Sequence, residues 1–190
     1  MKKIAIFASG TGSNAERLIQ HFSQSDVARV ELLVSNVPDC GAVQKAKQHQ
    51  VNVLIYDNAA FRDQGEMIAA ELKSQQIDLI VLAGFLRMIP QALIRDFGKR
   101  MLNVHPALLP KFGGKGMYGM RVHEAVIAAG EKESGISIHR VTEHYDEGDI
   151  LFQAKCSIND QDTAESLAIK IHDLEHLHFP LVVEKFVAQC

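Results

Sequence analysis

The sequence predicts a single α/β domain built on a doubly wound, mostly parallel sheet. Short apolar runs alternate with amphipathic stretches through its first half. Each run is apolar at successive positions, which is typical of strands that are covered by helices on both faces of a sheet. Over its 190 residues there is no repeat, low-complexity tract or linker. A chain of this length, 47% hydrophobic and 23% charged, is long enough to bury one substantial core.

The first half supplies most of the expected sheet. Helices between successive buried strands favour parallel pairing, with helices on both faces of the sheet. Pro90 stands in the first turn of the helix expected at 90–97, a position that suits proline. Strands are expected at 3–8, 30–35, 53–56, 77–83 and 102–105, and helices at 15–24, 42–50, 61–75 and 90–97.

The second half changes character. Residues 111–120 contain four glycines and predict a mobile loop. A short helix at 123–129 should end at Gly130, which tolerates the left-handed cap conformation. Two further strands are expected at 135–141 and 150–156, around a polar, acidic turn. Asp162 and Glu165 resemble a capping box that opens a helix to about 177, and Pro180 should kink or break it.

The charge and cysteine content exclude several classes of protein. A net charge of -3 and a pI near 6.3 predict no basic surface for nucleic acid or for an acidic membrane. The longest apolar run near the N-terminus, Ile4 to Ala8, is too short for a signal peptide or a membrane span. The three widely spaced cysteines are typical of reduced thiols. We therefore expect a cytoplasmic protein.

A glycine-rich loop lies between the first strand and the first helix, at Ser9 to Asn14. Glycines let a backbone turn sharply, and the unpaired N–H groups of a helix start suit a phosphate. With Ala15 the segment also fits a dinucleotide fingerprint, which needs an acidic residue at the end of the second strand. Ser35 and Asn36 occupy that place, and neither is acidic, so the sequence does not meet this second requirement of a dinucleotide site. Phosphate binding is favoured, and an ordinary strand-to-helix turn remains the alternative.

Asn103 and His105 end a predicted interior strand and, being two residues apart, point to the same side of it. Carboxyl ends of parallel strands are where α/β proteins bind ligands. An amide and an imidazole together can donate hydrogen bonds to an oxygen that gains negative charge. Asp146, in the acidic turn, would orient His105, raise its pKa and accept a proton through water. Purely structural roles remain open, because the spacing does not show that residues 103 and 146 meet.

Three segments resemble the folate-dependent formyltransferase family. The similarity runs from about Lys3 to Val183, and the loop at 9–14 resembles the branch of the family that acts on glycinamide ribonucleotide. The resemblance implies a phosphate-binding half over about 1–100 and a catalytic, folate-binding half over about 101–190. The segments are Leu82-Ala83-Gly84-Phe85-Leu86-Arg87, Asn103-Val104-His105-Pro106-Ala107-Leu108-Leu109-Pro110, and Gln153-Ala154.

By resemblance, the site residues form three groups, around the acceptor, the folate and the reacting atoms. The acceptor group is Gly12, Ser13 and Asn14 at the phosphate, with Arg62, and Glu175 at the glycinamide end; the folate group is Arg87, Met88, Ile89, Val141, Thr142 and Glu143; the catalytic group is Asn103, His105 and Asp146.

The resemblance also implies the reaction. The amine of glycinamide ribonucleotide attacks the formyl carbon of 10-formyltetrahydrofolate, and Asn103 and protonated His105 stabilise the tetrahedral oxyanion. Neither a metal nor a covalent enzyme intermediate is required. Members of the family are monomers or homodimers. This sequence departs from the family at 111–120, which is longer and richer in glycine, and at His172, where some members have glutamine.

Four alternatives stay open at the level of sequence. His172 to His176 matches the H-x-x-E-H pattern of a zinc peptidase helix, although a third metal ligand would have to come from the last residues of the chain. Formyltetrahydrofolate deformylase shares the catalytic trio, but normally carries a further N-terminal domain. Methionyl-tRNA formyltransferase would need a basic C-terminal domain. A non-catalytic nucleotide-binding module would have no need of the trio.

Overall fold

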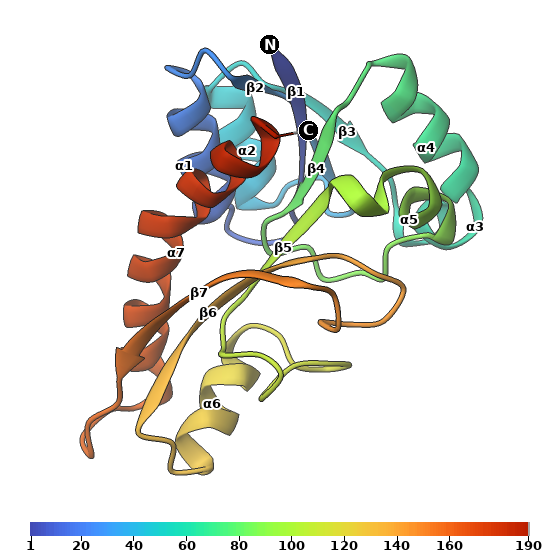
Figure 1. The fold of residues 1–190 in the computed structure, drawn as a ribbon. Coiled ribbons are helices and arrows are strands. Elements are labelled where there is room, and N and C mark those ends of the chain that lie inside the picture. The colour runs from blue at the N-terminus through green and yellow to red at the C-terminus, as the bar shows by residue number, and fades with distance from the viewer. Residues whose placement is uncertain (190) are drawn as a thin grey trace.

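The protein is described by a computed structural model that covers residues 1–189. Its seven strands form one sheet in the order β3-β2-β1-β4-β5-β6-β7, and helices cover both faces (Figure 1). The strands are β1 Lys2–Phe7, β2 Ala28–Ser35, β3 Asn52–Ile55, β4 Leu79–Leu82, β5 Met101–His105, β6 Glu133–Arg140 and β7 Ile150–Ser157. The helices are α1 Ser13–Phe22, α2 Gly41–Gln48, α3 Asn58–Asp63, α4 Gly65–Ser74, α5 Gln91–Phe97, α6 Met120–Ala128 and α7 Ala164–Val187, with a 3₁₀ turn η1 at Gly98–Arg100.

The first five strands pair in parallel, and β6 and β7 pair antiparallel to their neighbours. The prediction of a doubly wound, mostly parallel α/β domain is therefore confirmed. The topology has a functional consequence. Since β6 runs back along β5, the turn that follows β6 begins beside the start of β5, and its residue Asp146 lies next to His105 at the end of β5. The loop before α6 follows that same end of β5.

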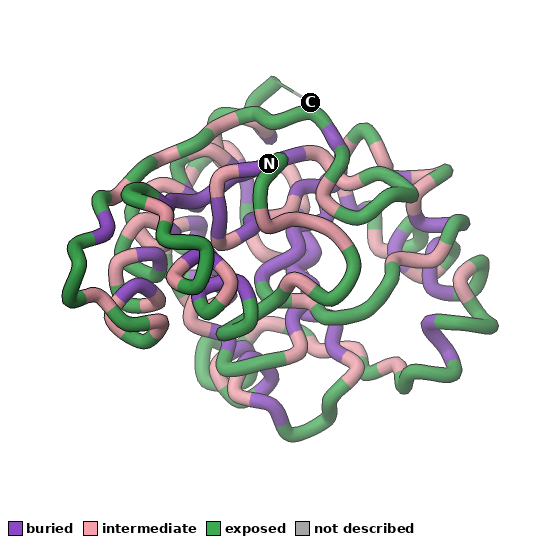
Figure 2. The backbone as a smooth tube through the Cα atoms, turned by 90° about the horizontal axis from the view of Figure 1, so that it is seen from below, coloured by how far each residue is buried: buried purple, intermediate pink, exposed green. Residues whose placement is uncertain are grey.

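The central strand β1 shows why the sheet has two cores. Ile4 and Ile6 pack with α1, α2 and α7 on one face, while Ala5 and Phe7 pack with α4 and α5 on the other. All four side chains are buried, which explains why the strand is apolar at four successive positions after its two lysines, instead of at alternate ones. Figure 2 shows the buried stretches inside the molecule and the exposed stretches around them.

The single helix expected at 61–75 is wrong: the structure has two helices, α3 and α4. The Asp57 side chain accepts a hydrogen bond of 2.7 Å from the Ala60 backbone N–H and so starts α3 three residues early. At Gln64 the backbone leaves the helical region, with φ at -122°. Gly65 then packs so closely on Pro90 that an added Cβ would lie 2.6 Å from the proline ring.

The expected cap of the last helix is wrong, and Pro180, which was expected to kink or break this helix, does not break it. Thr163, not Asp162, is the N-cap, and it forms a capping box with Ser166. The helix then continues through Pro180 to Val187. A proline leaves the carbonyl four residues earlier without its helical partner. Here that carbonyl belongs to His176 and accepts a hydrogen bond of 3.3 Å from Nε of Arg17 on α1.

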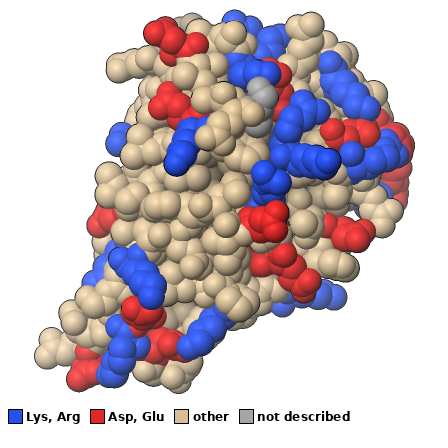
Figure 3. All heavy atoms as spheres, viewed as in Figure 1, with Lys and Arg blue, Asp and Glu red and all other residues tan. Residues whose placement is uncertain are grey.

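The surface carries charges of both signs. On the face shown in Figure 3, lysine and arginine lie among aspartate and glutamate, with an uncharged area between them. Among residues 1–189, no helix is both long and apolar enough to cross a membrane.

Candidate active site

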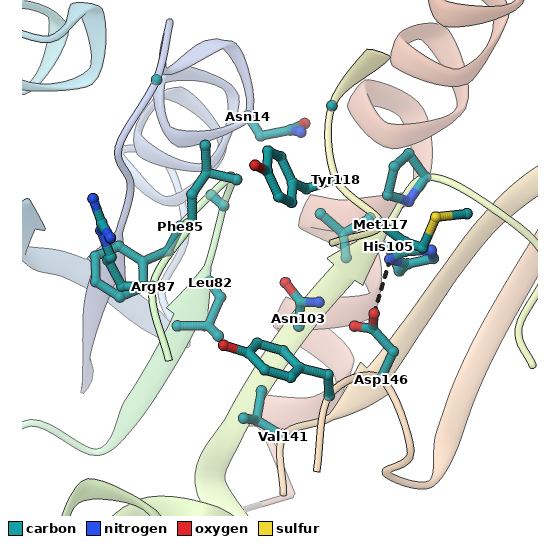
Figure 4. A pocket seen from close by; sticks show the side chains of 18 of the residues that line it. Asn14, Leu82, Phe85, Arg87, Asn103, His105, Met117, Tyr118, Val141 and Asp146 are labelled. Atoms are coloured by element: carbon teal, nitrogen blue, oxygen red, sulfur yellow. Dashed lines mark ion pairs between the residues drawn. The ribbon is translucent and has the colours of Figure 1, made fainter. Parts of the chain in front are cut away.

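A cavity of about 610 Å³ opens at the carboxyl ends of β1, β4 and β5, where open α/β sheets bind their ligands. Figure 4 shows Asn103, His105 and Asp146 together on one side of it, and Phe85 and Arg87 on the other. The walls come from five segments, together with His172 and Glu175 of α7. The segments are 10–14, 82–89, 103–106, 114–123 without 120 and 122, and 139–146 without 140.

The loop at Ser9 to Asn14 reaches the cavity through the N-terminus of α1. Gly12 has a left-handed backbone, with φ at 76°, and a Cβ there would lie 2.3 Å from Cα of Ala42. Only glycine meets both conditions without strain. No side chain caps α1, so its first backbone N–H groups face the cavity with the positive end of the helix dipole. This arrangement suits a phosphate.

The predicted trio comes together from two parts of the sheet. Asn103 and His105 lie on β5, and Asp146 lies in the turn between β6 and β7. Nδ1 of His105 is 3.4 Å from Oδ2 of Asp146. Asp146 itself has a left-handed backbone, with φ at 58°, a conformation that aspartate tolerates better than most residues. The structure thus places side by side three residues that lie up to 43 positions apart (146 − 103).

His139 joins this cluster, although the sequence pattern did not point to it. It pairs with Asn103 across β5 and β6, and its Nε2 lies 3.0 Å from Nδ2 of Asn103. Its Nδ1 donates to the backbone carbonyl of Arg140 at 2.8 Å, so Nε2 is left to accept from the Asn103 amide. The same Nε2 is 3.5 Å from Oδ1 of Asp146. One imidazole therefore fixes the orientation of Asn103 and contacts the carboxylate of Asp146.

The glycine-rich loop contacts both ionisable members of the trio. The carbonyl of Phe112 lies 2.8 Å from Nε2 of His105, and since a carbonyl only accepts, Nε2 carries the proton. The backbone N–H of Gly114 donates to Oδ2 of Asp146 at 2.9 Å. The loop is thus part of the site and holds both side chains in place.

The ionisation of His105 differs from the expectation. Asp146 does pull the pKa of His105 upward, but the ring is 3% exposed, and this burial outweighs the carboxylate and lowers the pKa below its usual value. The resting imidazole is therefore neutral at neutral pH. The histidines His139 and His105 beside Asp146, together with the backbone N–H of Gly114, keep the pKa of Asp146 low against its own burial. A proton gained by His105 would enter at Nδ1 and face an ionised Asp146.

The segments expected to hold a folate line the opposite end of the same cavity. Arg87 and Phe85 lie on its far side from Asp146 (Figure 4). Leu82, Phe85, Met88, Ile89 and Val141 give this end an apolar wall, as a flat aromatic ring requires. All six residues of the expected folate group line the cavity: Arg87, Met88, Ile89, Val141, Thr142 and Glu143.

The residues expected at the acceptor are divided by the structure. Glu175 is 5% exposed and accepts a hydrogen bond of 2.7 Å from Nδ2 of Asn14, and both residues line the cavity. Burial raises the pKa of Glu175. Arg62 does not line the cavity: its side chain is 74% exposed on α3 and pairs with Asp63 at 2.8 Å.

The two histidines of the H-x-x-E-H pattern stack on one another, with ring centroids 5.9 Å apart. His172 lines the cavity and His176 does not. Within residues 1–189, no group of three or more histidine, cysteine, aspartate or glutamate side chains is arranged to hold a metal ion.

Fold and site together define a class of protein. It is an α/β domain with an Asn-His-Asp cluster at the carboxyl ends of its strands, in one cavity with a helix N-terminus suited to phosphate. The sequence pattern of the formyl transferase family matches residues 2–183. The chain therefore belongs to the formyl transferase family.

Individual relatives agree with this assignment. The chain is 41% identical over 187 residues to the chloroplastic phosphoribosylglycinamide formyltransferase of Vigna unguiculata, covering 96% of this chain and 60% of that protein. It is 32% identical to the phosphoribosylglycinamide formyltransferase of Bacillus subtilis, covering 98% of this chain and 95% of that protein. The chain thus spans less than two thirds of the plant protein and nearly all of the bacterial one.

Solved structures show the same fold. The glycinamide ribonucleotide transformylase 1 of Symbiobacterium toebii superposes with a TM-score of 0.91 at 29% identity, covering 100% of this chain and 89% of that one. The phosphoribosylglycinamide formyltransferase of Bacillus halodurans superposes with a TM-score of 0.87 at 36% identity, covering 97% and 94%.

Proposed function

We propose that this chain transfers the formyl group of 10-formyltetrahydrofolate to the amine of glycinamide ribonucleotide, a step of purine synthesis. One observation carries the proposal: the Asn103, His105 and Asp146 cluster lies in the same cavity as the phosphate-type loop at 10–14. Formyl transfer to a phosphorylated acceptor needs reacting groups such as this cluster and, in the same cavity, a place for the phosphate. The relatives named above support it as well, since their names state this activity.

The acceptor would lie between α1 and α7. Gly12, Ser13 and Asn14 would hold its phosphate at the N-terminus of α1, and Glu175 would face its glycinamide end. The formyl-folate would enter from the side of Arg87, Met88 and Ile89, with residues 141–143 over its ring. Arg62 remains a candidate for the phosphate, although its pairing with Asp63 would first have to break.

The chemistry proposed is direct displacement. The acceptor amine attacks the formyl carbon, and the carbonyl oxygen becomes an oxyanion. Asn103 donates to it with the amide hydrogen that His139 does not use, and such a donor contributes roughly 3 kcal/mol to lowering the barrier. The amine loses one proton, and the departing folate nitrogen gains one. His105 is placed to carry this proton, because Asp146 stabilises its charged form.

The reaction proposed needs no metal, since the leaving nitrogen is protonated and the oxyanion has protein donors. We further propose a reducing compartment such as the cytoplasm, in keeping with the free thiols of Cys40 and Cys156. Relatives come both from chloroplasts and from bacteria. A monomer and a homodimer are both compatible with this proposal.

The test is formyl transfer from 10-formyltetrahydrofolate with and without glycinamide ribonucleotide, followed by detection of formylated product. Turnover should require the ribonucleotide, and Asn103→Ala should lower kcat by roughly 10²- to 10³-fold. Asn52→Ala is the matched control, because Asn52 is exposed on β3, away from the cavity. Release of formate at the same rate without the acceptor would instead identify a deformylase. Binding of both ligands without turnover would identify a non-catalytic module.

A further inference from the structure

His123 is a buried polar side chain that the proposed reaction does not use. It lies in the first turns of α6, lines the cavity and is 4% exposed. Its Nδ1 is buried and has no hydrogen-bond partner among residues 1–189. A buried polar atom without a partner costs roughly 1–3 kcal/mol, so such atoms are rare and call for an explanation.

A second unpartnered atom lies in the same cavity. Oδ1 of Asn14 is buried without a partner, although Nδ2 of the same amide donates to Oε2 of Glu175. Asn14 is on α1, Glu175 on α7 and His123 on α6, and α7 packs against both other helices. His172, with Nε2 4.0 Å from Glu175, lies between them on α7. Three helices thus surround one polar end of the cavity.

The chemistry of these atoms defines what they bind. Oδ1 of Asn14 only accepts hydrogen bonds, so this atom selects a group with O–H or N–H donors, whereas the phosphate would be held by the backbone N–H groups at the start of α1. Burial, His172 and His105 lower the pKa of His123, so its ring is neutral and can either donate or accept. A neighbouring pair of sugar hydroxyls both donates and accepts, and it meets all of these requirements.

We propose that His123 is a specificity-determining residue that binds a ribose hydroxyl of the acceptor through Nδ1, in the cavity that Asn14 also lines. This inference rests on the proposed function and adds a contact to the acceptor site. It gives both unpartnered atoms a partner when the acceptor is bound. It also assigns a substrate contact to α6, the helix that begins where the glycine-rich loop ends.

The test compares His123→Leu with His123→Asn in the full chain. The two new side chains have nearly the same size, but asparagine keeps a polar atom near the position of Nδ1. His123→Leu should raise the KM for glycinamide ribonucleotide roughly tenfold, with a much smaller effect on kcat and on the KM for 10-formyltetrahydrofolate. His123→Asn should stay within about threefold of the unmodified chain.

His176→Leu is the matched control. His176 also has a buried, unpartnered ring nitrogen, Nε2, but it does not line the cavity. Its KM for the ribonucleotide should equal that of the unmodified chain. Equal KM values for His123→Leu and His123→Asn, both raised, would mean that the ring matters for packing alone and would overturn the proposal. An unchanged KM in His123→Leu would overturn it as well.

A measurement on the unmodified chain covers the case in which a variant does not fold. In protein labelled with ¹⁵N-histidine, the Nδ1 resonance of His123 should shift when glycinamide ribonucleotide is added without folate. No movement at saturating ribonucleotide would overturn the proposal. Failure of the proposed function is distinguishable, because the unmodified chain would then form no formylated ribonucleotide at all.

Discussion

Asn103 carries two amide hydrogens, and the neighbouring strand uses one of them. Nδ2 of Asn103 lies 3.0 Å from Nε2 of His139, whose own Nδ1–H is engaged by the Arg140 carbonyl at 2.8 Å. This chain of contacts fixes which way the amide faces, and it leaves the second N–H of this cavity-lining residue available to a ligand. His139 therefore acts as a positioning residue for the group that should stabilise the oxyanion.

Replacing His139 by leucine should disturb the reaction more than the fold. Without its acceptor, the Asn103 amide is free to turn, and loss of alignment at a reacting centre costs up to about 100-fold in rate. We expect kcat of His139→Leu to fall between about ten- and 100-fold, with little change in either KM. His139→Gln offers an amide oxygen near the position of Nε2 and should recover most of the rate. Equal losses in both variants would show that the ring is needed only for packing.

At this scale, part of the cluster follows from sequence. Asn103 and His105 could be predicted because strand alternation alone puts them on one side, at the end of a buried run. The role of His139 could not, because it depends on the register that pairs it with Asn103. A usable signal was present: Ser137 and His139 are polar residues at alternate positions of an otherwise buried strand. The neutral state of His105 depends on burial, which no local pattern reports.

Among the elements, the loop at 111–120 has the largest influence on the site, through Phe112 and Gly114. Gly113 between them allows the close approach. A Cβ there would lie 2.5 Å from Cδ2 of Leu109 and 3.3 Å from Cβ of Asp146. A side chain at this position would therefore push the loop away from the turn that carries Asp146.

Gly113→Ala should consequently lower kcat by roughly tenfold, since small displacements of reacting groups have effects of this size. Steady-state kinetics with both substrates saturating would measure it. Gly98→Ala is the control: its Cβ would meet Cγ2 of Ile94 at an ordinary 3.5 Å, far from the cavity. If Gly113→Ala keeps the full kcat, the contacts of the loop with His105 and Asp146 are not needed for turnover.

The limits of sequence at this scale are visible in α7. A proline deep inside a helical stretch, as Pro180 is in α7, normally predicts a break. Here the freed carbonyl of His176 finds Arg17, which is 159 positions away in the chain, and the helix continues to Val187. The division of 58–74 into α3 and α4 likewise depends on the contact of Gly65 with Pro90. Both are decided by tertiary contacts.

At the scale of the whole molecule, the apolar runs were enough to predict the parallel part of the sheet, because strands covered on both faces are apolar throughout. The antiparallel β6 and β7 were expected as strands, but not their direction. Their reversal is what returns the chain to β5 and brings Asp146 within 3.4 Å of His105. The site therefore exists only in the complete fold, which links its ionisation to stability.

Burial lowers the pKa of three histidines: His105, His123 and His176. In the unfolded chain, a histidine takes up its proton near pH 6.5, about its free value, whereas these three take it up at lower pH when folded. As the pH falls through about 6.5, the unfolded state therefore binds more protons than the folded state. The free energy of unfolding then falls with the pH. Glu175 acts in the opposite direction. Because its pKa is raised, the folded state takes up this proton at a higher pH than the unfolded state does, so the free energy of unfolding rises as the pH falls.

A difference measurement separates these contributions. We expect urea unfolding at pH values from 7.5 down to 5 to show a shallower decline for His123→Asn than for the unmodified chain, since the variant lacks one buried neutral imidazole while Glu175 is common to both. The free energy of unfolding of the variant should therefore rise relative to that of the unmodified chain as the pH falls. Parallel curves for His123→Asn and the unmodified chain would mean that His123 titrates alike in the folded and unfolded states, and that its ring is hydrated despite its burial.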